Sequence, residues 1–360
     1  MTTPGALSRR ARFAYRRRRE WRWLIADERK NPYPVTIAQR LRAWRLGFLS
    51  QSYLLYELDR RDSIRNYVKD SSRYLRFSRL NSPYSIILHD KLIFGEVFRR
   101  HPNLLPETFA LLRHGVVMPR ADAEPVESVD GVLDLLARRR RLVLKGTKGW
   151  GGADVTVLED LGGDVSLGGK RVSREEARRE IASRKEHVLV EYVEQAAYAR
   201  EIFPDSANSI RMLTMIDVDS GEPFLARAVH RFGSRSTKRM DNFTQGGMCA
   251  MVDAETGTLG TGIRVLPSGR PEEIESHPDT GARITGAAVR DWPGVLRRVL
   301  EVAAEHAYLP YVGWDVVVTE DGIRLLEGNA NSGTDVLQVH GPLLADPRVR
   351  RFYKRRGFLH

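Results

Sequence analysis

The spacing of hydrophobic residues changes along the chain near residue 142. From Trp23 to Leu80, and again over 130–140, apolar residues recur three or four positions apart, which predicts helices. Beyond that point they alternate with polar residues or form short runs, which indicates strands. Strands are expected at 142–145, 155–158, 188–193, 212–218, 224–229, 248–252, 316–318 and 323–326, and helices at 173–184 and 292–306.

Prolines punctuate this pattern. The Asn-Pro-Tyr-Pro run at 31–34 breaks the N-terminal helices. Another helix is expected to end near Arg100, and Pro102, Pro106 and Pro119 predict a short, irregular segment after it. Because hairpin-like strand pairs outnumber strand–helix–strand units, we expect an α+β architecture with mostly antiparallel sheets.

Composition excludes several classes of protein. A chain of 360 residues that is 42% hydrophobic can bury a sizeable core, so disorder throughout is excluded. The single cysteine, Cys249, can form neither an internal disulfide nor a zinc site of several thiolates, which favours a reducing compartment. The chain has no run of ~18 apolar residues and no apolar signal-peptide core. The expected location is the cytoplasm, with association with a membrane as an option.

Charge is concentrated at the two ends of the chain. The formal net charge is +12, and much of the excess precedes residue 80 or follows residue 347. The arginines of 8–22 surround aromatic residues, so this segment is either a basic surface for anionic lipid or a phosphorylated partner, or a solvated helix face. The mixing of arginines with aromatics favours the solvated face. Nucleic acid is not expected as a partner.

A glycine-rich loop lies between two predicted strands. Residues 145–152 read Lys-Gly-Thr-Lys-Gly-Trp-Gly-Gly. Glycines let backbone N–H groups approach a phosphate closely, and Lys145 and Lys148 add positive charge. A Walker loop would place its lysine after the last glycine and before a helix, and kinase motifs are also missing. The loop is therefore either a phosphate-binding hairpin or a flexible turn, and its lysines favour phosphate. The candidate residues are Lys145, Lys148, Gly149, Gly151 and Gly152.

Two acidic residues flank a second predicted hairpin. If residues 320–322 (Glu-Asp-Gly) form a three-residue turn, pairing is centred on Asp321 and Asp315 lies opposite Glu327. Such partners have Cβ atoms about 5 Å apart, and Asn329 points the same way. This oxygen-rich set suits Mg²⁺ bound together with ATP, and the cation would relieve repulsion between the carboxylates. The alternative is a hairpin in water, but the apolar strands between them favour burial and a metal.

The order of these features resembles the ATP-grasp superfamily, and specifically its sugar-transfer-associated branch. The matching motifs are Asp90-Lys91, Lys145 with its glycine loop, LVEYVEQ from Leu189, NSIR ending at Arg211, DNFTQGG from Asp241, HPDTG from His277, GWD ending at Asp315 and EGN ending at Asn329. The resemblance implies two α+β subdomains that clasp ATP, preceded by a basic helical region. The implied segments are 1–80 (N-terminal region), 81–125 (ATP-grasp N-terminal segment), 126–191 (glycine-loop lid), 192–345 (metal-binding subdomain) and 346–360 (basic tail).

The same resemblance implies roles for individual residues in nucleotide binding. Lys91 and Lys145 match positions that hold the α- and β-phosphates. Glu191, Tyr192 and Val193 should receive the adenine. Glu194 is the candidate for the ribose hydroxyls, with Glu201 as its rival. Two Mg²⁺ ions are implied, one held by Asp315 and Glu327 and one by Glu327 and Asn329, with Mn²⁺ able to substitute.

Further residues match the reaction centre and the substrate side. Arg211 resembles the arginine that steadies a phosphate or acyl-phosphate oxygen, which suits its planar fork. A second basic group comes from Arg227, Arg231 or Lys238, and the choice stays open. Asn242 is either a substrate-side residue or a turn residue. His277 is more often a solvated loop residue than a functional one, and Cys249 is most simply a small buried residue.

The activity implied is ATP-dependent joining of a carboxylate to an amine through an acyl phosphate. Charge neutralisation and alignment govern phosphoryl transfer, which accounts for a site of lysines, an arginine and magnesium ligands. The substrates would be small carboxylates and amines derived from sugars or amino acids, in polysaccharide or cell-envelope precursor modification. The alternatives are a phosphotransferase that releases a stable phosphorylated product, and a non-catalytic basic protein at a membrane surface.

Overall fold

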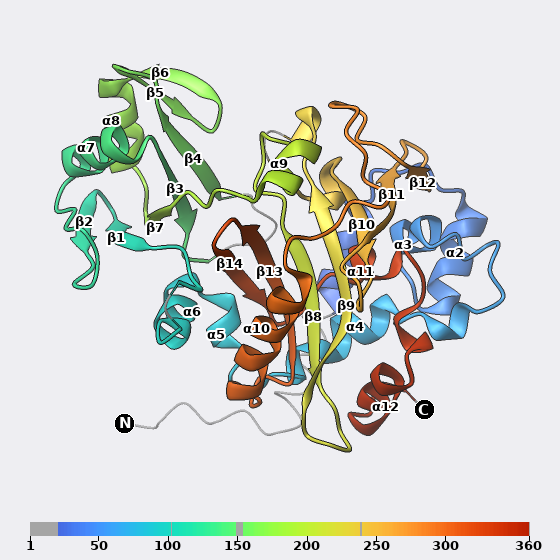
Figure 1. Cartoon of the computed structure of the whole chain (residues 1–360). Coiled ribbons are helices and arrows are strands. Elements are labelled where there is room, and N and C mark those ends of the chain that lie inside the picture. The colour runs from blue at the N-terminus through green and yellow to red at the C-terminus, as the bar shows by residue number, and fades with distance from the viewer. Residues whose placement is uncertain (1–20, 102, 149–153, 238–239, 360) are drawn as a thin grey trace, which may run out of the picture.

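The computed structural model describes residues 21–101, 103–148, 154–237 and 240–359. It contains two seven-stranded sheets with helices around them (Figure 1). All paired strands within both sheets run antiparallel. The predicted α+β architecture is therefore confirmed.

The small sheet has the strand order β2-β1-β7-β3-β4-β5-β6. Its strands are β1 (Thr108–Arg113), β2 (Val116–Pro119), β3 (Arg141–Gly146), β4 (Val155–Asp160), β5 (Asp164–Leu167), β6 (Lys170–Ser173) and β7 (Glu186–Glu191). The helices α7 (Val129–Arg139) and α8 (Arg174–Ala182) pack against it, and Leu136 and Ile181 share a core with Leu142 and Leu158. We call this sheet with its two helices the lid; β1 and β2 precede the segment 126–191 that was expected to form it.

Strands β1 and β2 correct the expectation of an irregular segment after Arg100. Of the prolines that suggested it, Pro106 precedes β1, Pro119 is the last residue of β2, and Pro102 lies outside the described residues. Strand β2 is also an edge strand, where a residue without an N–H is tolerated. The helices predicted at 130–140, 173–184 and 292–306 are confirmed.

The large sheet has the strand order β12-β11-β10-β9-β8-β13-β14. Its strands are β8 (Ile210–Ile216), β9 (Pro223–Phe232), β10 (Met248–Val252), β11 (Leu259–Val265), β12 (Pro271–Ile274), β13 (Tyr311–Thr319) and β14 (Gly322–Asn329). One face buries Met212 and Trp314 under α10 (Trp292–Glu305), α5 (Ile86–His89) and α6 (Lys91–Phe98). The other face buries Leu213 and Met215, because alternate residues of β8 point to opposite sides.

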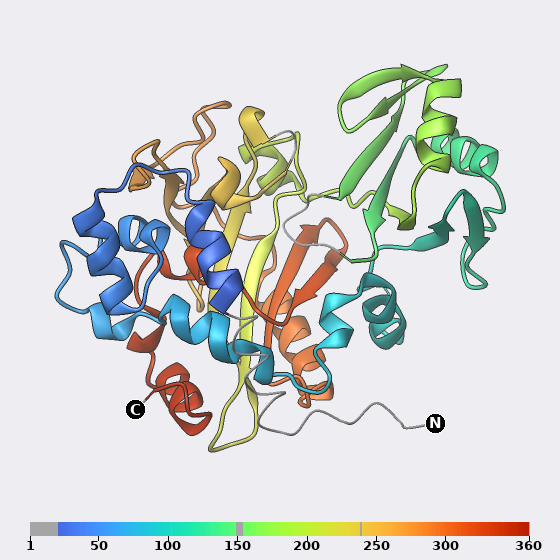
Figure 2. The same cartoon turned by 180° about the vertical axis from the view of Figure 1, so that it is seen from behind.

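Helices from both ends of the chain cover this second face. They are α2 (Ile37–Leu46), α3 (Ser50–Leu55), α4 (Asp70–Arg76), α11 (Thr334–Gln338) and α12 (Pro347–Arg355), together with a helix at 21–29. Figure 2 shows the N-terminal helices, in blue, in front of the sheet when the molecule is seen from behind. Shorter elements are α9 (Ala197–Ile202) and the 3₁₀ turns η1 (Ile64–Asn66), η2 (Phe77–Arg79), η3 (Arg235–Thr237), η4 (Phe243–Gln245) and η5 (Leu343–Ala345).

Aromatic packing joins the N-terminal region to the C-terminal one. The ring of Phe77 lies 5.3 Å from that of Tyr311, 5.6 Å from that of Tyr353 and 5.5 Å from that of Phe358, measured between centroids. Tyr53, buried with them, belongs to the same core. Aromatic rings contribute large buried areas, so the part of the N-terminal region from α3 onward is integral to the large subdomain.

Candidate active site

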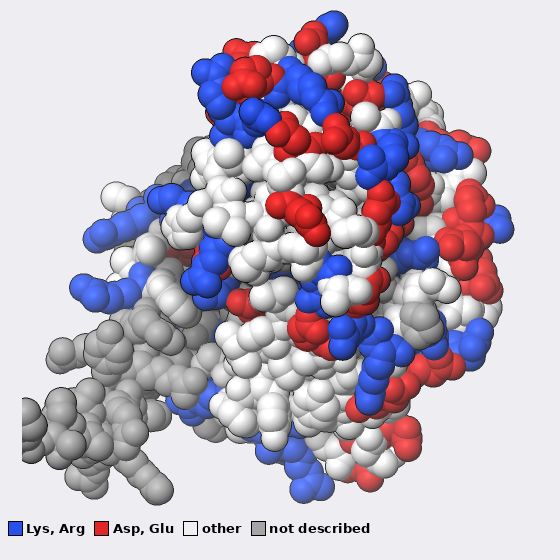
Figure 3. Space-filling model, turned by 90° about the vertical axis from the view of Figure 1, so that its left-hand side faces the viewer, with Lys and Arg blue, Asp and Glu red and all other residues white. Residues whose placement is uncertain are grey.

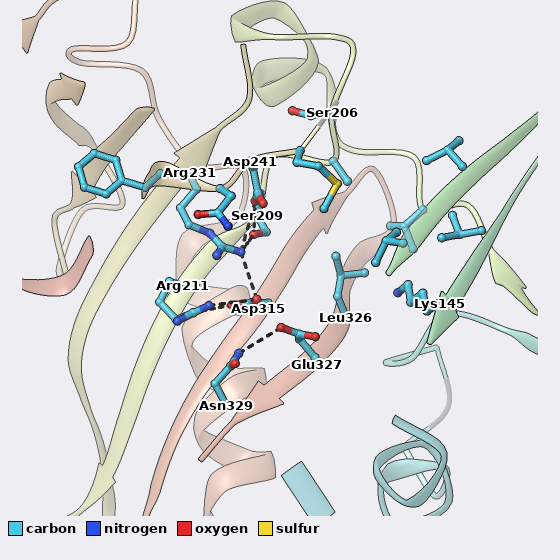
Figure 4. A pocket seen from close by; sticks show the side chains of 18 of the residues that line it. Lys145, Ser206, Ser209, Arg211, Arg231, Asp241, Asp315, Leu326, Glu327 and Asn329 are labelled. Atoms are coloured by element: carbon cyan, nitrogen blue, oxygen red, sulfur yellow. Dashed lines mark hydrogen bonds and ion pairs between the residues drawn. The ribbon is translucent and has the colours of Figure 1, made fainter. Parts of the chain in front are cut away.

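A cavity of about 390 Å³ lies between the two sheets. Its walls come from β3, β4 and β7 of the lid and from β8, β9, β13 and β14 of the large sheet, and Figure 4 shows the side chains that converge on it. Among the residues proposed from the sequence, eleven line this cavity. They are Lys91, Lys145, Glu191, Tyr192, Val193, Arg211, Arg231, Asn242, Asp315, Glu327 and Asn329.

The β13–β14 hairpin brings Asp315 opposite Glu327, as the sequence predicted, but by another route. Thr319 pairs with Gly322 and Val316 with Leu325, so the turn has two residues and not three. The register then shifts by one residue, and Asp315 pairs with Glu327. The extra residue on β14 is Leu326, which makes this a β-bulge.

The bulge has a direct consequence for the cavity. In a regular strand, successive side chains point to opposite faces. Here Leu326 and Glu327 are neighbours in sequence and both line the cavity. One bulge thus supplies an apolar contact and a carboxylate to the same space.

The Asp315 carboxylate is held between two arginines from neighbouring strands. Arg211 donates from Nε to Oδ1 at 2.5 Å and from Nη2 to Oδ2 at 3.2 Å, and Arg231 Nη2 lies 3.1 Å from Oδ2. Burial alone would raise the pKa of Asp315, but the two guanidinium groups hold it at about 2. Asp315 is therefore ionised at any physiological pH.

Buried partners fix the position of Arg211. Its Nη1 donates to the hydroxyl of Ser332 at 3.0 Å, and Ser332 is fully buried. A Cβ at Gly313 would lie 2.3 Å from that hydroxyl oxygen, so only glycine fits there. Sequence analysis identified Gly313 as part of a motif, whereas Ser332 was missed because no local pattern marks it.

Glu327 is the second carboxylate of the site. Its Oε1 accepts a hydrogen bond from Asn329 Nδ2 at 3.4 Å, and its Oε2 lies 3.7 Å from Lys91 Nζ. Removal from water raises the pKa of Glu327, and the nearby Asp315 carboxylate raises it further, against the lysine. The negative charges of the two carboxylates thus repel each other.

The two predicted phosphate lysines meet at this end of the cavity. Asp90 caps α6 by accepting from Leu92 N at 3.0 Å and Ile93 N at 3.2 Å, which places Lys91 in the first turn of the helix. Removal from water lowers the pKa of Lys145 to about 8, with Glu327 opposing the shift and Lys91 adding to it. Two cations held this close suit a ligand with several negative charges.

The lid side of the cavity combines an apolar patch with charged residues. The patch consists of Val143, Val155, Val157, Tyr192 and Val193. The Arg141 guanidinium lies 4.2 Å from the centre of the Tyr192 ring. One oxygen of Glu191 accepts from Glu107 N at 2.8 Å, so this carboxylate also ties β7 to the segment before β1.

Several proposed residues lie elsewhere. Glu194 pairs with Arg141 and does not line the cavity, and neither does its rival Glu201. Lys148 is exposed and lines a different, open hollow on the lid. Gly149, Gly151, Gly152 and Lys238 lie outside the described residues.

The structure narrows the choice among the basic residues of β9. Arg227 donates to the carbonyl oxygens of Leu337 and Gly341 and does not line the cavity. Arg231 does line it, and it also lies 3.4 Å from Asp241. The Nε of Arg231 is buried without a hydrogen-bond partner in the part of the chain that the structure describes. An anionic ligand oxygen is the natural partner for such a donor.

Three further residues can now be interpreted. Asn242 lines the cavity and also caps a 3₁₀ turn by accepting from Thr244, so both of its proposed roles stay open. His277 is buried and not solvated, since its ring stacks on Phe203 and its Nε2 lies 2.9 Å from Gly233 O.

Cys249 is buried beside His340, as expected for a structural residue. Burial raises the pKa of this thiol and lowers that of the imidazole to about 3.

The donor set at the hairpin fits Mg²⁺. Within the described residues, no group of three or more His, Cys, Asp and Glu side chains is placed to hold a metal. The two carboxylates and Asn329 nevertheless form an all-oxygen set, which is what Mg²⁺ prefers when phosphate and water complete its shell. A divalent cation would also remove the repulsion that raises the pKa of Glu327.

Comparison with known proteins gives the class of this chain. Residues 71–352 match the sugar-transfer associated ATP-grasp family. The chain belongs to that family, whose members are typically ADP-forming ligases that use ATP and Mg²⁺ with small-molecule substrates. No curated protein matches the chain.

Solved structures with some similarity include other ATP-grasp enzymes. One is N5-carboxyaminoimidazole ribonucleotide synthetase in complex with ADP (12% identity, TM-score 0.36, 69% of this chain and 46% of that chain). Two others are D-alanyl-alanine synthetase A from Vibrio cholerae (8%, 0.40, 77% and 62%) and D-alanine–D-alanine ligase from Helicobacter pylori (10%, 0.41, 81% and 69%). The chain thus spans less than half of the first of these proteins. The family assignment rests on the sequence match.

Proposed function

We propose that this protein is an ADP-forming ligase that joins a carboxylate to an amine through an acyl phosphate. The observation that carries the proposal is the meeting of two carboxylates and four cations in one cavity. These groups are Asp315, Glu327, Lys91, Lys145, Arg211 and Arg231. Phosphoryl transfer needs positioning and charge neutralisation more than acid–base help, and this arrangement supplies both.

Each wall of the cavity suits a different part of the nucleotide. The apolar patch of the lid side, with Val143 and Val157, suits the base and the lysines suit the phosphates. Mg²⁺, when bound by Glu327 and Asn329 with Asp315, would neutralise phosphate oxygens. Arg211 and Arg231 stand beside this point as fixed donors, so they would stabilise charge that develops on the transferred group.

The reaction balances in two steps. An oxygen of the substrate carboxylate attacks the γ-phosphorus of ATP, the bond to the bridging oxygen breaks, and ADP leaves. The amine nitrogen then attacks the acyl carbon, the bond to the phosphate oxygen breaks, inorganic phosphate leaves, and the proton on nitrogen passes to water. An enclosed cavity would protect the acyl phosphate from hydrolysis between the steps.

The direct test is substrate-dependent ADP release. Purified protein with Mg-ATP is incubated with pooled small carboxylates and amines, and products are identified by mass spectrometry. ADP formation that requires one carboxylate and one amine together, with an amide as product, supports the proposal. Turnover that ignores every amine, or a stable phosphorylated product, would instead identify a phosphotransferase.

The pathway and the location are further parts of the proposal. We place the reaction in the cytoplasm, in modification of polysaccharide or cell-envelope precursors, by analogy with the family's sugar-transfer association. Among the described residues, no helix has the length and apolarity needed to cross a bilayer. Accumulation of an unmodified precursor after gene deletion would test the pathway.

Peripheral membrane contact is a proposal supported by α2. Ile37, Leu41 and Trp44 follow helical spacing and are 81%, 61% and 52% exposed, with Arg42 and Arg45 beside them. An apolar stripe flanked by arginines suits an anionic membrane surface. By contrast, Figure 3 shows basic and acidic side chains intermixed over the lid, which would not attract a polyanion.

Binding to anionic vesicles that falls steeply with salt would support this contact. Replacing Leu41 and Trp44 with serine should abolish it, because both side chains are exposed and available to lipid. Such point changes are preferable to deletion, since later residues of this region are part of the core. Equal binding by the doubly substituted protein would exclude α2 as the contact.

A further inference from the structure

The N-terminal region contributes to the cavity. Arg73 of α4 lines it, together with Asn331, Gly333 and Asp335 from the segment that follows β14. In Figure 1, α4 and α11 lie on one side of the β13–β14 hairpin and the lid strands β3 and β4 lie on the other. The cavity therefore continues past the hairpin, away from the lid side.

Arg73 makes a hydrogen bond and a ring contact but no ion pair with a described residue. Its Nε donates to Asn331 Oδ1 at 3.3 Å, and its guanidinium lies 5.1 Å from the centre of the Tyr74 ring. No acidic oxygen of a described residue lies within 4.0 Å of it, and its nearest acidic neighbour in sequence, Asp70, accepts instead from Leu49 N at 2.8 Å. Burial would lower the pKa of Arg73, but Tyr74 and then Asp335 and Asp70 raise it above its usual value.

Asp335 is the matching anion. Its carboxylate makes no hydrogen bond or ion pair with a described residue, in contrast to Asp241 and Asp315, which are both tied to arginine. The Asp335 side chain folds back over the main chain at Gly333. A Cβ at that glycine would lie 2.5 Å from Asp335 Oδ1. Asp335 and Arg73 thus line the same cavity, and no ion pair joins them.

An arginine and an aspartate that share a cavity without pairing are complementary to a ligand that carries both charges. We infer that this part of the cavity binds a free α-amino acid, with its carboxylate at Arg73 and its ammonium group at Asp335, as the amine substrate. Arginine suits a carboxylate through its planar fork, and charge-assisted hydrogen bonds are the strong ones. Asn331 follows Asn329 by two residues, so the site adjoins the proposed phosphate site.

This inference rests on the proposed ligase function, because it names the amine that attacks the acyl phosphate. It also explains why the region from α3 onward is folded into the large subdomain. Arg73 reaches the cavity only because the buried residues around α4, such as Tyr67 and Phe77, fix that helix against the sheet. From the sequence, the only function expected for this region was contact with an anionic partner.

Thermal-shift and calorimetric binding measurements test the inference. The full chain is titrated with each proteinogenic α-amino acid, with and without Mg-ADP. The same measurements use the N-acetyl and carboxamide derivatives of any binder, and glucosamine as an amine without a carboxylate. We expect at least one free amino acid to bind, and each derivative, lacking one charge, to bind about tenfold or more weakly.

Three variants complete the experiment. Asp335→Asn and Arg73→Gln should each weaken amino-acid binding about tenfold to a hundredfold and leave Mg-ADP binding unchanged. Glu255→Gln removes an exposed charge elsewhere and should change neither. If a variant does not fold, the comparison of derivatives on the unmodified protein still decides the question.

The inference is overturned if no amino acid binds under either condition, if the derivatives or glucosamine bind as well as the free amino acid, or if folded Asp335→Asn and Arg73→Gln proteins bind it normally. Failure of Mg-ADP to bind would count against the proposed function and not against this site, because amino-acid binding is also measured without nucleotide.

Discussion

The two walls of the cavity are built in opposite ways. The lid wall sets separate apolar side chains, such as Val143 and Val157, among charged ones that include Lys145. The large-sheet wall is a connected set of charges in which Arg211 and Arg231 hold Asp315, and Asp315 in turn perturbs Glu327. Changes to independent contacts should have small, additive effects, whereas a change to a connected network should disturb all its members.

The largest effect is expected from Glu327→Gln. Losing this carboxylate should lower turnover by about 100-fold or more, because even residues behind a metal's ligands cost 10- to 100-fold. Without Mg²⁺ the variant should be as stable as the parent or more so at pH 7. The pKa of Glu327 is raised, so its charged form is disfavoured in the folded state and glutamine removes that penalty. ADP release and thermal unfolding measure the two effects, with Glu255→Gln as control. Normal turnover would exclude Glu327 as a metal ligand.

Arg231→Lys should have the next largest effect. Loss of a fixed donor at the transferred group typically lowers kcat about 100-fold, and the shorter lysine cannot reproduce the guanidinium fork. Arg227→Lys is the matched control on the same strand and should leave kcat close to that of the parent, because among the described residues Arg227 donates to the main-chain carbonyls of Leu337 and Gly341. If kcat falls equally in both variants, the substitutions lower it by destabilising β9 and not by removing a contact with the transferred group. Steady-state kinetics and unfolding curves separate these outcomes.

A moderate, pH-dependent effect is expected at Lys145. Its pKa of about 8 means that the lysine is charged below that pH and loses its charge as the pH rises through it. Affinity for Mg-ADP should therefore fall about tenfold between pH 7 and pH 9, following the protonated fraction. Lys145→Arg keeps its charge over this range and should give a flatter profile. A parent profile as flat as that of the arginine variant would contradict a phosphate-binding role.

The smallest effect is expected on the lid wall. Val157→Ala removes apolar surface worth about 1 kcal/mol, so nucleotide affinity should fall about fivefold with kcat unchanged. Val172→Ala, which removes the same atoms from the lid core away from the cavity, is the control and should change unfolding more than binding. A loss of kcat in Val157→Ala would show that the two walls are coupled, and the lid contacts would then not be independent of the charge network.

The sequence was sufficient to predict the sheet class, the positions of eight strands along the chain and the facing pair Asp315 and Glu327. It succeeded with the pair although the turn was wrong by one residue, because the bulge at Leu326 restores the register. A bulge leaves little trace in a pattern of apolar residues, since Leu325 and Leu326 look like any buried pair. The alternation rule could therefore not reveal that Leu326 shares the cavity with Glu327.

Contacts between distant segments could not be predicted at all. Arg73 meets the Asn331–Asp335 segment only after α4 docks on the sheet, and Ser332 acquires its role only beside Arg211. Arg227 and Arg231 lie on the same face of β9, because the β8–β9 register shift falls before Arg227, so the choice of Arg231 depends on which end of the strand borders the cavity. Such information is tertiary, so local spacing does not contain it.

The aromatic cluster around Phe77 has a consequence for how this chain can be divided. Phe77 belongs to the N-terminal region and Tyr353 and Phe358 to the C-terminal end, yet all of them pack on Tyr311 or on one another. A fragment trimmed at either end would lose contacts that the opposite end also requires. The large sheet is therefore not a transplantable module, and recombination that joins it to a foreign neighbour would have to carry both flanks along.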